Sequence, residues 1–336
     1  MPKPKVFITA YGDNRREMFT ERMLDRLREF AEPVLNDLDR PLTADEAKER
    51  IADCDAILTT WGTPKFTTRE VKAAPRLRVI AHAAGSLRSV VDPEVLDLGV
   101  TVTHAAAGIA PMVGEMALAL TLACLRRLTQ HDRVMKRDPH LGEERRPDAN
   151  MTLLGARVGL VGFGWTAREY VRLLEPFGCD VCACDPFASA EAAAEHGVRL
   201  VSLEEALRHS RVVSLHAAKL EFTHHMIGRE ELAMLPDGAV LINTARGSLI
   251  DEEALIAELR TGRIWAGLDV TESEPPGEDS PLRSLPNVIL TPHVAGPTTE
   301  GRWLLVDAMI EELRRVFVEG KEPLFKVTKD KFEYMA

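Results

Sequence analysis

The chain has 336 residues, of which 45% are hydrophobic and 28% are charged, and its formal net charge is −10. This length is typical of about two domains, and the composition excludes a collagen, a disordered chain and a disulfide-rich miniprotein. The excess of acidic residues argues against nucleic acid or an anionic membrane as a partner.

In the N-terminal third of the chain, short apolar runs typical of buried strands alternate with amphipathic patterns typical of helices. Thr43 and Glu46 have the spacing of a capping box, in which a hydroxyl and a carboxylate each accept a backbone N–H at the start of a helix. Strands that alternate with helices indicate a parallel, doubly wound sheet. The expected elements are a strand at 6–8, helices at 15–30 and 43–52, and strands at 56–58 and 79–81.

The segment Met112–Leu128 is apolar almost all the way round, so a helix formed here must be covered on every side, within a domain core or between two subunits. Its longest nearly apolar run, Met116–Leu125, has 10 residues, whereas a membrane span needs about 20. No secretory signal opens the chain, and we expect a soluble protein. Residues Asp138–Asn150 contain two prolines, a glycine and several charges, which predicts a surface loop.

A second alternating series begins near Ala156 and predicts another doubly wound parallel sheet. Together the two series predict an α/β protein with two Rossmann-like domains. The expected strands of the second series lie at 158–161, 181–184, 212–215, 240–242, 267–270 and 288–290.

The strongest local motif is a glycine-rich loop between the first strand of this series and a helix expected to begin near Arg168. Gly162 permits the tight turn, Gly164 lets the backbone approach a pyrophosphate, and Ala167 allows close packing of helix on strand. Asp185 directly follows the next strand, 23 residues after Gly162, where a carboxylate binds ribose hydroxyls and repels a 2′-phosphate. The loop alone also fits a glycine-rich turn of any α/β protein. Together with Asp185 it predicts NAD rather than NADP.

Neither the cysteines nor a histidine pair predict a metal site. Cys179, Cys182 and Cys184 lie in or beside one strand, where alternate side chains point to opposite faces, so buried strand cysteines are favoured over zinc ligands. The odd total of five cysteines indicates reduced thiols and a cytoplasmic location. His224 and His225 are adjacent on an expected surface loop, and neighbours seldom converge on one ion. We therefore expect no metal.

Three later segments each follow a predicted strand and carry residues suited to hydride exchange at a 2-keto or 2-hydroxy acid. The Arg246 guanidinium can bind a carboxylate through two parallel hydrogen bonds. His293 can donate a proton to the carbonyl oxygen and take it back in the reverse direction, and Glu274 can stabilise the charged imidazole. Each has an ordinary alternative: an interdomain salt bridge, a backbone cap and a solvated acidic loop, respectively. Behind a dinucleotide loop, the three together predict a catalytic set.

Through these motifs the sequence resembles the NAD-dependent D-isomer-specific 2-hydroxyacid dehydrogenase family, from about Leu77 to Thr299 and most specifically over Leu235–Thr298. The resemblance implies a flavodoxin-like substrate-binding domain at 1–103 plus 294–336, a dinucleotide-binding Rossmann domain at 104–293, and NAD in the cleft between them. It implies interconversion of a small D-2-hydroxy acid and its 2-keto acid, as in a glyoxylate or hydroxypyruvate reductase. It also implies a homodimer formed through the nucleotide-binding domain.

By the same resemblance, Arg246 binds the substrate, His293 is the acid/base, Glu274 is its partner, and Asp269 faces the nicotinamide carboxamide. The further cofactor-binding residues that we expect are Trp165, Thr166, His216, Ala217, Thr223, Thr244, Ala245 and Gly296. The further substrate-binding residues that we expect are Trp61, Ala84, Gly85 and Ser86.

The sequence departs from the family pattern in the substrate loop, which reads Ala83–Leu87 in place of Gly-x-Gly and is followed by Arg88. Arg88 is either a solvated charge or a contact for a second anionic group, as on a phosphonate analogue. Trp303 is expected to be a packing residue, whereas Trp61 fits packing and a pocket wall equally well. A different class of function, an NAD-sensing module without turnover, is disfavoured because the Arg–Glu–His set is intact.

Overall fold

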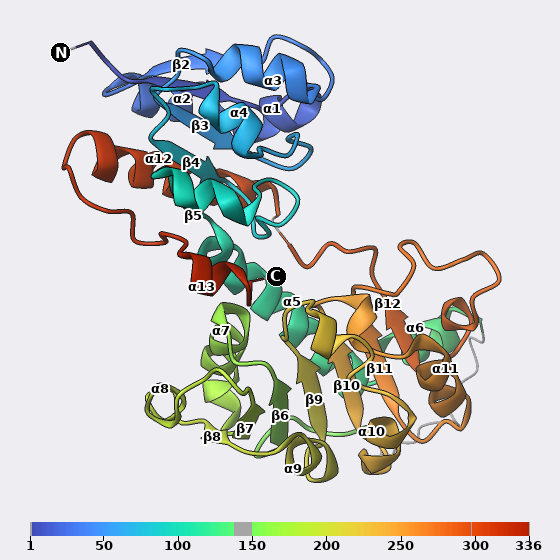
Figure 1. Cartoon of the computed structure of the whole chain (residues 1–336). Coiled ribbons are helices and arrows are strands. Elements are labelled where there is room, and N and C mark those ends of the chain that lie inside the picture. The colour runs from blue at the N-terminus through green and yellow to red at the C-terminus, as the bar shows by residue number, and fades with distance from the viewer. Residues whose placement is uncertain (1, 138–149, 297, 336) are drawn as a thin grey trace. The chain divides into compact units, whose positions relative to one another are not determined.

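The computed structural model describes residues 2–137, 150–296 and 298–335. Apart from Asn150, the expected surface loop at Asp138–Asn150 lies outside these residues. All the described strands belong to two parallel sheets, which confirms the α/β class with two parallel-sheet units (Figure 1).

The chain divides into two compact units, a terminal unit made of Met1–Ile109 and Pro297–Ala336 and a central unit, Ala110–Gly296. The expected limits, after residues 103 and 293, come slightly before the observed ones. The first observed limit falls inside helix α5 (Ala106–Leu125). Because that helix is apolar along most of its length, the sequence gives no sign of where one unit ends and the next begins.

The terminal unit is built on a five-stranded parallel sheet. Its elements in chain order are β1 (Lys5–Ile8), α1 (Gly12–Met18), α2 (Glu21–Arg28), β2 (Glu32–Leu35), α3 (Ala44–Ile51), β3 (Ala56–Thr59), α4 (Thr68–Lys72), β4 (Val79–His82), η1 (Pro93–Leu98), β5 (Thr101–His104), α12 (Thr299–Phe317) and α13 (Lys329–Phe332). The strand order is β2-β1-β3-β4-β5. Val6 and Ile8 pack in a cluster with α1, α2 and α12, whereas Phe7 packs in another with α3, α4, η1 and α13. Successive strand residues point to opposite faces, so both faces of this sheet are covered.

Two expectations for this unit are corrected by the structure. The single helix expected at 15–30 is two helices, because Thr20 has extended backbone angles and begins α2 as its N-cap. Strands β2 and β5 were not predicted; β2 is an edge strand, where Pro33 is tolerated because no neighbour needs its missing N–H. The capping box is confirmed: Glu46 N–H donates to Thr43 Oγ1 and Thr43 N–H donates to Glu46 Oε2.

The central unit is built on a seven-stranded parallel sheet. After α5, its elements in chain order are α6 (Leu128–Arg137), β6 (Arg157–Val161), α7 (Trp165–Leu174), η3 (Glu175–Phe177), β7 (Asp180–Cys184), α8 (Ala190–Ala194), β8 (Arg199–Leu200), α9 (Leu203–Arg208), β9 (Val212–Leu215), η4 (Glu221–Thr223), α10 (Arg229–Met234), β10 (Val240–Asn243), η5 (Gly247–Leu249), α11 (Glu252–Arg260), β11 (Trp265–Leu268), η6 (Pro281–Arg283) and β12 (Val288–Leu290). The strand order is β12-β11-β10-β9-β6-β7-β8. The chain leaves β6 toward one edge and returns to β9 on its other side. Ligands of open α/β sheets bind at such a switch point, beyond the carboxyl ends of the strands.

Three expectations for the central unit need correction. Strand β11 begins two residues before the expected 267–270, because Val240 of β10 pairs with Trp265. Helix α7 begins at Trp165, three residues before Arg168. The two-residue strand β8 was not predicted, since it is too short for a periodic pattern. The other five strands of the second series are confirmed to within one residue.

Helix α5 has 20 residues and begins six residues before the expected Met112. Among the described residues it is the one helix long and apolar enough to cross a membrane, by length and composition only. The sequence expectation, based on a 10-residue apolar run, had judged this segment too short to span a membrane, and the length of the observed helix corrects that judgement. A core helix passes the same test, and α5 buries Leu120 and Cys124 against the glycine position Gly267 of β11. These buried residues show that α5 packs on the seven-stranded sheet.

Candidate active site

The glycine-rich loop between β6 and α7 leaves room for a ligand at one position and for nothing at another. Gly162 has a φ of +93°, and a Cβ added there would lie 2.6 Å from the Ala217 N atom. Gly164 is the N-cap of α7, and within the described part of the chain a Cβ added there would meet no atom within 4 Å. Gly162 therefore shapes the turn, while Gly164 leaves open space at the helix N-terminus, where the first amides are free, as a pyrophosphate site requires.

Asp185 lies directly after β7 and is tied to this loop. Its Oδ2 accepts the Phe163 N–H at 2.6 Å, and its Oδ1 accepts the Phe187 N–H at 2.8 Å. Each carboxylate oxygen keeps a further lone pair for a ribose hydroxyl. The structure thus places the expected acidic residue beside the glycine-rich loop.

Two expected cofactor residues carry buried polar atoms that lack partners. Both ring nitrogens of His216, after β9, and Oγ1 of Thr244, after β10, have no hydrogen-bond partner within the described residues. Burial lowers the pKa of His216 to about 3, so its imidazole is neutral and offers one donor and one acceptor. Unpaired buried polar groups are costly, and they fit a polar ligand such as a dinucleotide at these strand ends.

His293 and Glu274 form a close pair. His293 Nδ1 lies 2.6 Å from Glu274 Oε2, and both side chains are partly exposed. His293 follows β12 and has a φ of +54°, an uncommon conformation for a residue with a side chain. Because Nδ1 faces the carboxylate, Nε2 is the nitrogen left to exchange a proton with a substrate.

Arg246 is influenced by the charge of Glu274, the partner of His293. Burial lowers the pKa of its guanidinium, and the negative charge of Glu274 opposes that shift. Asn243 shapes the turn that presents it, since its side chain donates to Arg246 O and accepts the Ala245 N–H. A Cβ added at the following Gly247 would overlap the Thr271 carbonyl, so the Arg246 loop packs closely on the segment that leads to Glu274.

Asp269 has a role that sequence reasoning missed. This residue is 1% exposed, and its carboxylate accepts the Thr291 hydroxyl at 2.5 Å and the amides of Val294 and Ala295 at 2.9 and 2.8 Å. The expected contact with a nicotinamide carboxamide stays a prediction. The structure shows this carboxylate holding the loop that carries His293.

The remaining expected cofactor residues divide into two groups. The Thr223 hydroxyl is used within its own loop, where it bonds Ala218 O and both backbone groups of Leu220. The others lie at the carboxyl ends of strands or next to the glycine-rich loop, and their contacts with a cofactor stay predictions; they are Trp165, Thr166, Ala217, Ala245 and Gly296.

In the terminal unit, the expected substrate loop follows β4, with Ala84 buried and Gly85 and Ser86 partly exposed. A buried histidine, His82, and a partly buried one, His104, lie beside it and were missed by sequence reasoning. His104 Nδ1 donates to Gly85 O at 3.1 Å, and His82 Nδ1 lies 2.8 Å from Thr59 Oγ1. Their common position at the ends of neighbouring strands could have revealed them. The substrate-binding roles of Ala84, Gly85 and Ser86 stay predictions.

Three other residues of this unit were singled out in the sequence. The Arg88 guanidinium is exposed, as expected of a solvated charge, and it also donates to the carbonyls of Glu333 and Met335 in the C-terminal segment. The Trp303 indole donates to Glu17 O, in keeping with a packing residue. Trp61 is 39% exposed, and its role as a pocket wall stays a prediction.

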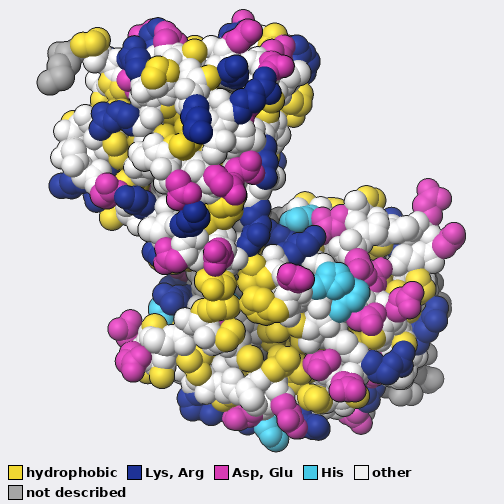
Figure 2. Space-filling model, viewed as in Figure 1, with side chains coloured by type: hydrophobic (Ala, Val, Ile, Leu, Met, Phe, Trp, Pro, Cys, Tyr) yellow, Lys and Arg dark blue, Asp and Glu magenta, His cyan; other side chains and the backbone are white. Residues whose placement is uncertain are grey.

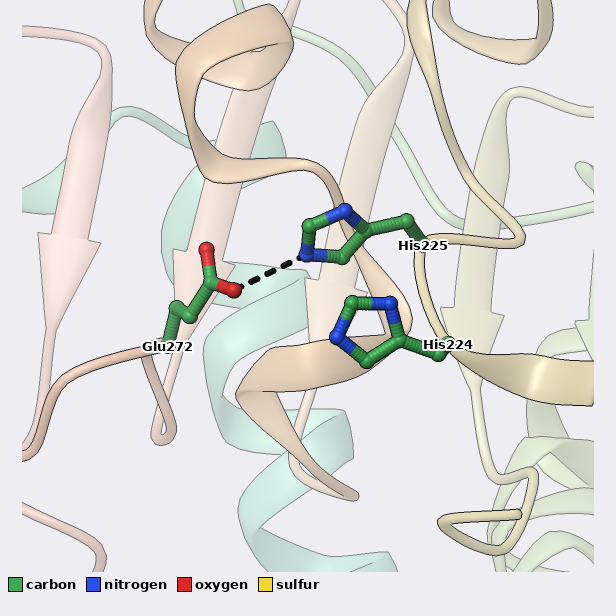
Figure 3. A group of neighbouring side chains, drawn as sticks. All are labelled: His224, His225 and Glu272. Atoms are coloured by element: carbon green, nitrogen blue, oxygen red, sulfur yellow. Dashed lines mark hydrogen bonds and ion pairs between the residues drawn. The ribbon is translucent and has the colours of Figure 1, made fainter. Parts of the chain in front are cut away.

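His224 and His225 differ from the sequence expectation. A carboxylate does join them: Glu272, 47 residues later, lies 2.9 Å from His225 Nε2 (Figure 3). The two imidazoles also stack on one another rather than pointing apart. The sequence separation hid Glu272, because only the packing of the two loops brings it to the histidines.

Comparison with known proteins covers both units. Residues 118–295 match the family model described as D-isomer specific 2-hydroxyacid dehydrogenase, NAD binding domain. The chain is 34% identical over 327 residues to a glyoxylate reductase of Korarchaeum cryptofilum, covering 96% of this chain and 95% of that one. It is 34% identical over 288 residues to a hydroxypyruvate reductase of Thermotoga maritima, covering 85% and 88%. Among solved structures, Rhodotorula graminis D-mandelate dehydrogenase aligns with a TM-score of 0.84 and 26% identity, over 97% of this chain and 98% of that one.

Proposed function

Because the chain belongs to the D-isomer specific 2-hydroxyacid dehydrogenase family and is an NAD-dependent oxidoreductase, we propose that it reduces a small 2-keto acid such as glyoxylate or hydroxypyruvate to the D-2-hydroxy acid. The observation that carries this proposal is the 2.6 Å contact between His293 and Glu274, whose charge also acts on Arg246, in the same unit as the glycine-rich loop. The names of two relatives, glyoxylate reductase and hydroxypyruvate reductase, support the choice of substrate.

Arg246, His293 and Glu274 each have a separate role in the proposed reaction. Arg246 binds the substrate carboxylate and polarises the neighbouring carbonyl. NADH, when bound, supplies the hydride that adds to the carbonyl carbon. His293 donates a proton from Nε2 to the carbonyl oxygen, and Glu274 stabilises the imidazolium before that transfer. In oxidation the neutral imidazole of His293 takes the hydroxyl proton, so one residue serves both directions.

Four residues of the central unit would hold the cofactor. Gly164 and the N-terminal amides of α7 accommodate the pyrophosphate. Asp185 accepts hydrogen bonds from the adenosine ribose and repels a 2′-phosphate, which favours NADH over NADPH. His216 and Thr244 provide polar atoms for the rest of the dinucleotide.

A screen of the purified chain with NADH against a panel of 2-keto acids tests this function. We expect NADH absorbance to fall fastest with glyoxylate or hydroxypyruvate. NADH binding without oxidation by any 2-keto acid would instead support the NAD-sensing alternative. Faster reaction with a phosphonate analogue would support the other alternative, which has lost its one hint because Arg88 binds backbone carbonyls.

A cytoplasmic homodimer is the assembly that the chain supports best. The apolar residues Met112, Val113 and Met116 of α5 are only partly buried within the chain, so a second copy could cover them. The acidic net charge and the five free thiols are typical of a cytoplasmic protein. Light scattering should give twice the chain mass, and the mass of one chain would contradict the homodimer.

A further inference from the structure

The pair His224–His225 is held in an unusual arrangement. Neighbouring residues of an extended chain point to opposite sides, yet these two imidazoles stack with centroids 3.9 Å apart and planes 29° from parallel. The cause is the backbone of His225, whose φ of +52° turns its side chain back over that of His224. In this left-handed conformation, which residues with a side chain seldom adopt, both rings face the same side (Figure 3).

Glu272 completes a three-ligand group. One ring nitrogen from each histidine and one carboxylate oxygen of Glu272 all lie within 4.8 Å of one another. Figure 3 shows the Glu272 carboxylate pointing toward the same edge of both rings. The hydrogen bond from His225 Nε2 to Glu272 accounts for one imidazole only. The His224 ring, stacked on that of His225, keeps a nitrogen within reach of the same carboxylate.

The backbone around the group is fixed by its own hydrogen bonds. His225 N–H donates to Ser248 O at 2.8 Å, and Ile227 N–H donates to Leu249 O at 3.0 Å. On the other side, Glu272 N–H donates to Glu252 Oε2 at 2.9 Å. The two loops are therefore held in place before any ion arrives, which lowers the entropic cost of binding one.

The surroundings suit a cation. Glu272 and Glu252 place negative charge at the site, and Figure 2 shows exposed histidine surface beside acidic side chains on the central unit. His224 and Glu272 are exposed and His225 is partly exposed, so water can reach the group and fill further coordination positions. Two imidazoles and a carboxylate are ligands that Zn²⁺ and similar borderline ions prefer.

From this geometry we infer that His224, His225 and Glu272 form an open, three-ligand site for a divalent cation of the zinc type, separate from the His293–Glu274 pair. Glu272 lies two residues before Glu274. An ion bound here would tether the histidine loop to the segment that carries Glu274, and so restrain that segment.

Calorimetric titration of the full chain with Zn²⁺, in buffer without chelator, tests the site. We expect one ion per chain, and a Kd weakened at least about tenfold in each of His224→Gln and Glu272→Gln. His225→Asn should have the same effect, because asparagine tolerates the left-handed backbone but lacks the imidazole. His209→Gln is the matched control, an exposed histidine elsewhere in the central unit, and it should leave the Kd unchanged.

Two results would overturn the inference. One is the absence of Zn²⁺ binding at millimolar concentration, or binding that is unaffected by His224→Gln and Glu272→Gln. The other is binding that is lost in His293→Ala instead, which would place the ion at the catalytic pair. Hydrogen exchange gives an independent readout: Zn²⁺ should slow exchange of the amides at 271–273 in the wild type but not in His224→Gln.

Discussion

Asp269 holds His293 through both its backbone and its side chain. The Asp269 carbonyl accepts the His293 N–H at 2.8 Å, and the carboxylate accepts the amides of the two following residues, Val294 and Ala295. These bonds fix the reversal after β12 in which His293 adopts its positive φ. A buried acid in the neighbouring strand end therefore decides where the imidazole lies.

Replacing Asp269 by asparagine should misplace His293. The introduced amide group would present N–H donors to the backbone donors of Val294 or Ala295, so at least one buried hydrogen bond is lost. We expect a loss of about 1–3 kcal/mol in the free energy of unfolding, together with slower turnover. Urea unfolding and steady-state kinetics measure the two effects. The control Asp237→Asn, at an exposed aspartate, should change neither; wild-type values for Asp269→Asn would contradict the role assigned to it.

Removal of the His293 imidazole should abolish most turnover and leave cofactor binding intact. Without a general acid, reduction of a 2-keto acid should slow by about 10²- to 10⁴-fold. The rate of NADH oxidation measures turnover, and quenching of protein fluorescence by NADH measures binding. His293→Ala is compared with His131→Ala, at an exposed histidine. Near-normal turnover of His293→Ala would show that another group transfers the proton.

The two glycines of the dinucleotide loop should respond differently to alanine. Gly162→Ala forces a side chain into a left-handed backbone and against the Ala217 N atom, so it should destabilise the fold by about 1–3 kcal/mol. Gly164→Ala meets no described atom within 4 Å, so stability should be kept while NADH affinity falls. Thermal unfolding and NADH titration separate these outcomes. Unchanged NADH affinity in Gly164→Ala would argue against a pyrophosphate at this position.

Cofactor preference should depend on the Asp185 carboxylate. Asp185→Ser removes the charge that repels a 2′-phosphate, so the ratio of kcat/KM for NADPH to that for NADH should rise about tenfold, which corresponds to ~1.4 kcal/mol. Asp180→Ser, at the other end of the same strand, is the matched control. If the ratio stays the same in Asp185→Ser, the carboxylate does not face the ribose.

Acid should destabilise the chain through its buried histidines. Burial and, to a smaller extent, the charge of nearby His104 lower the pKa of His82 to about 3, whereas the unfolded chain binds this proton near its ordinary pKa of 6.5. The stabilising contribution is therefore complete above about pH 6.5 and is lost as the pH falls toward 3, by up to ~1.4 kcal/mol per pH unit for each such histidine. Urea unfolding between about pH 7.5 and 5.5 should show this slope, and His82→Gln should reduce it. A slope that His82→Gln leaves unchanged would contradict the assignment.

Some features of the fold and of the site could be predicted from local sequence because they depend on neighbours in the chain. The turn at Gly162, the capping box at Thr43 and most strands follow from spacing over a few residues. The sequence predictions were wrong at positions where contacts with distant residues, rather than the local sequence pattern, set the limits of an element. Strand β11 starts at Trp265 because β10 pairs with it, and the helix expected at 15–30 breaks at Thr20, whose extended backbone begins a second helix.

The sequence alone determined the α/β class and the glycine-rich loop, since these rest on residue type and short spacing. It predicted the Arg246–Glu274–His293 set from three segments that follow strands and from the family resemblance. The structure brings Glu274 to His293 as expected. Only the tertiary structure showed that Asp269 holds the histidine loop and that Glu272 joins His224 and His225. Contacts between residues far apart in the chain depend on which strands become neighbours in the sheet. Strand order is set by packing over the whole unit, and residues far apart in the chain carry no local record of it.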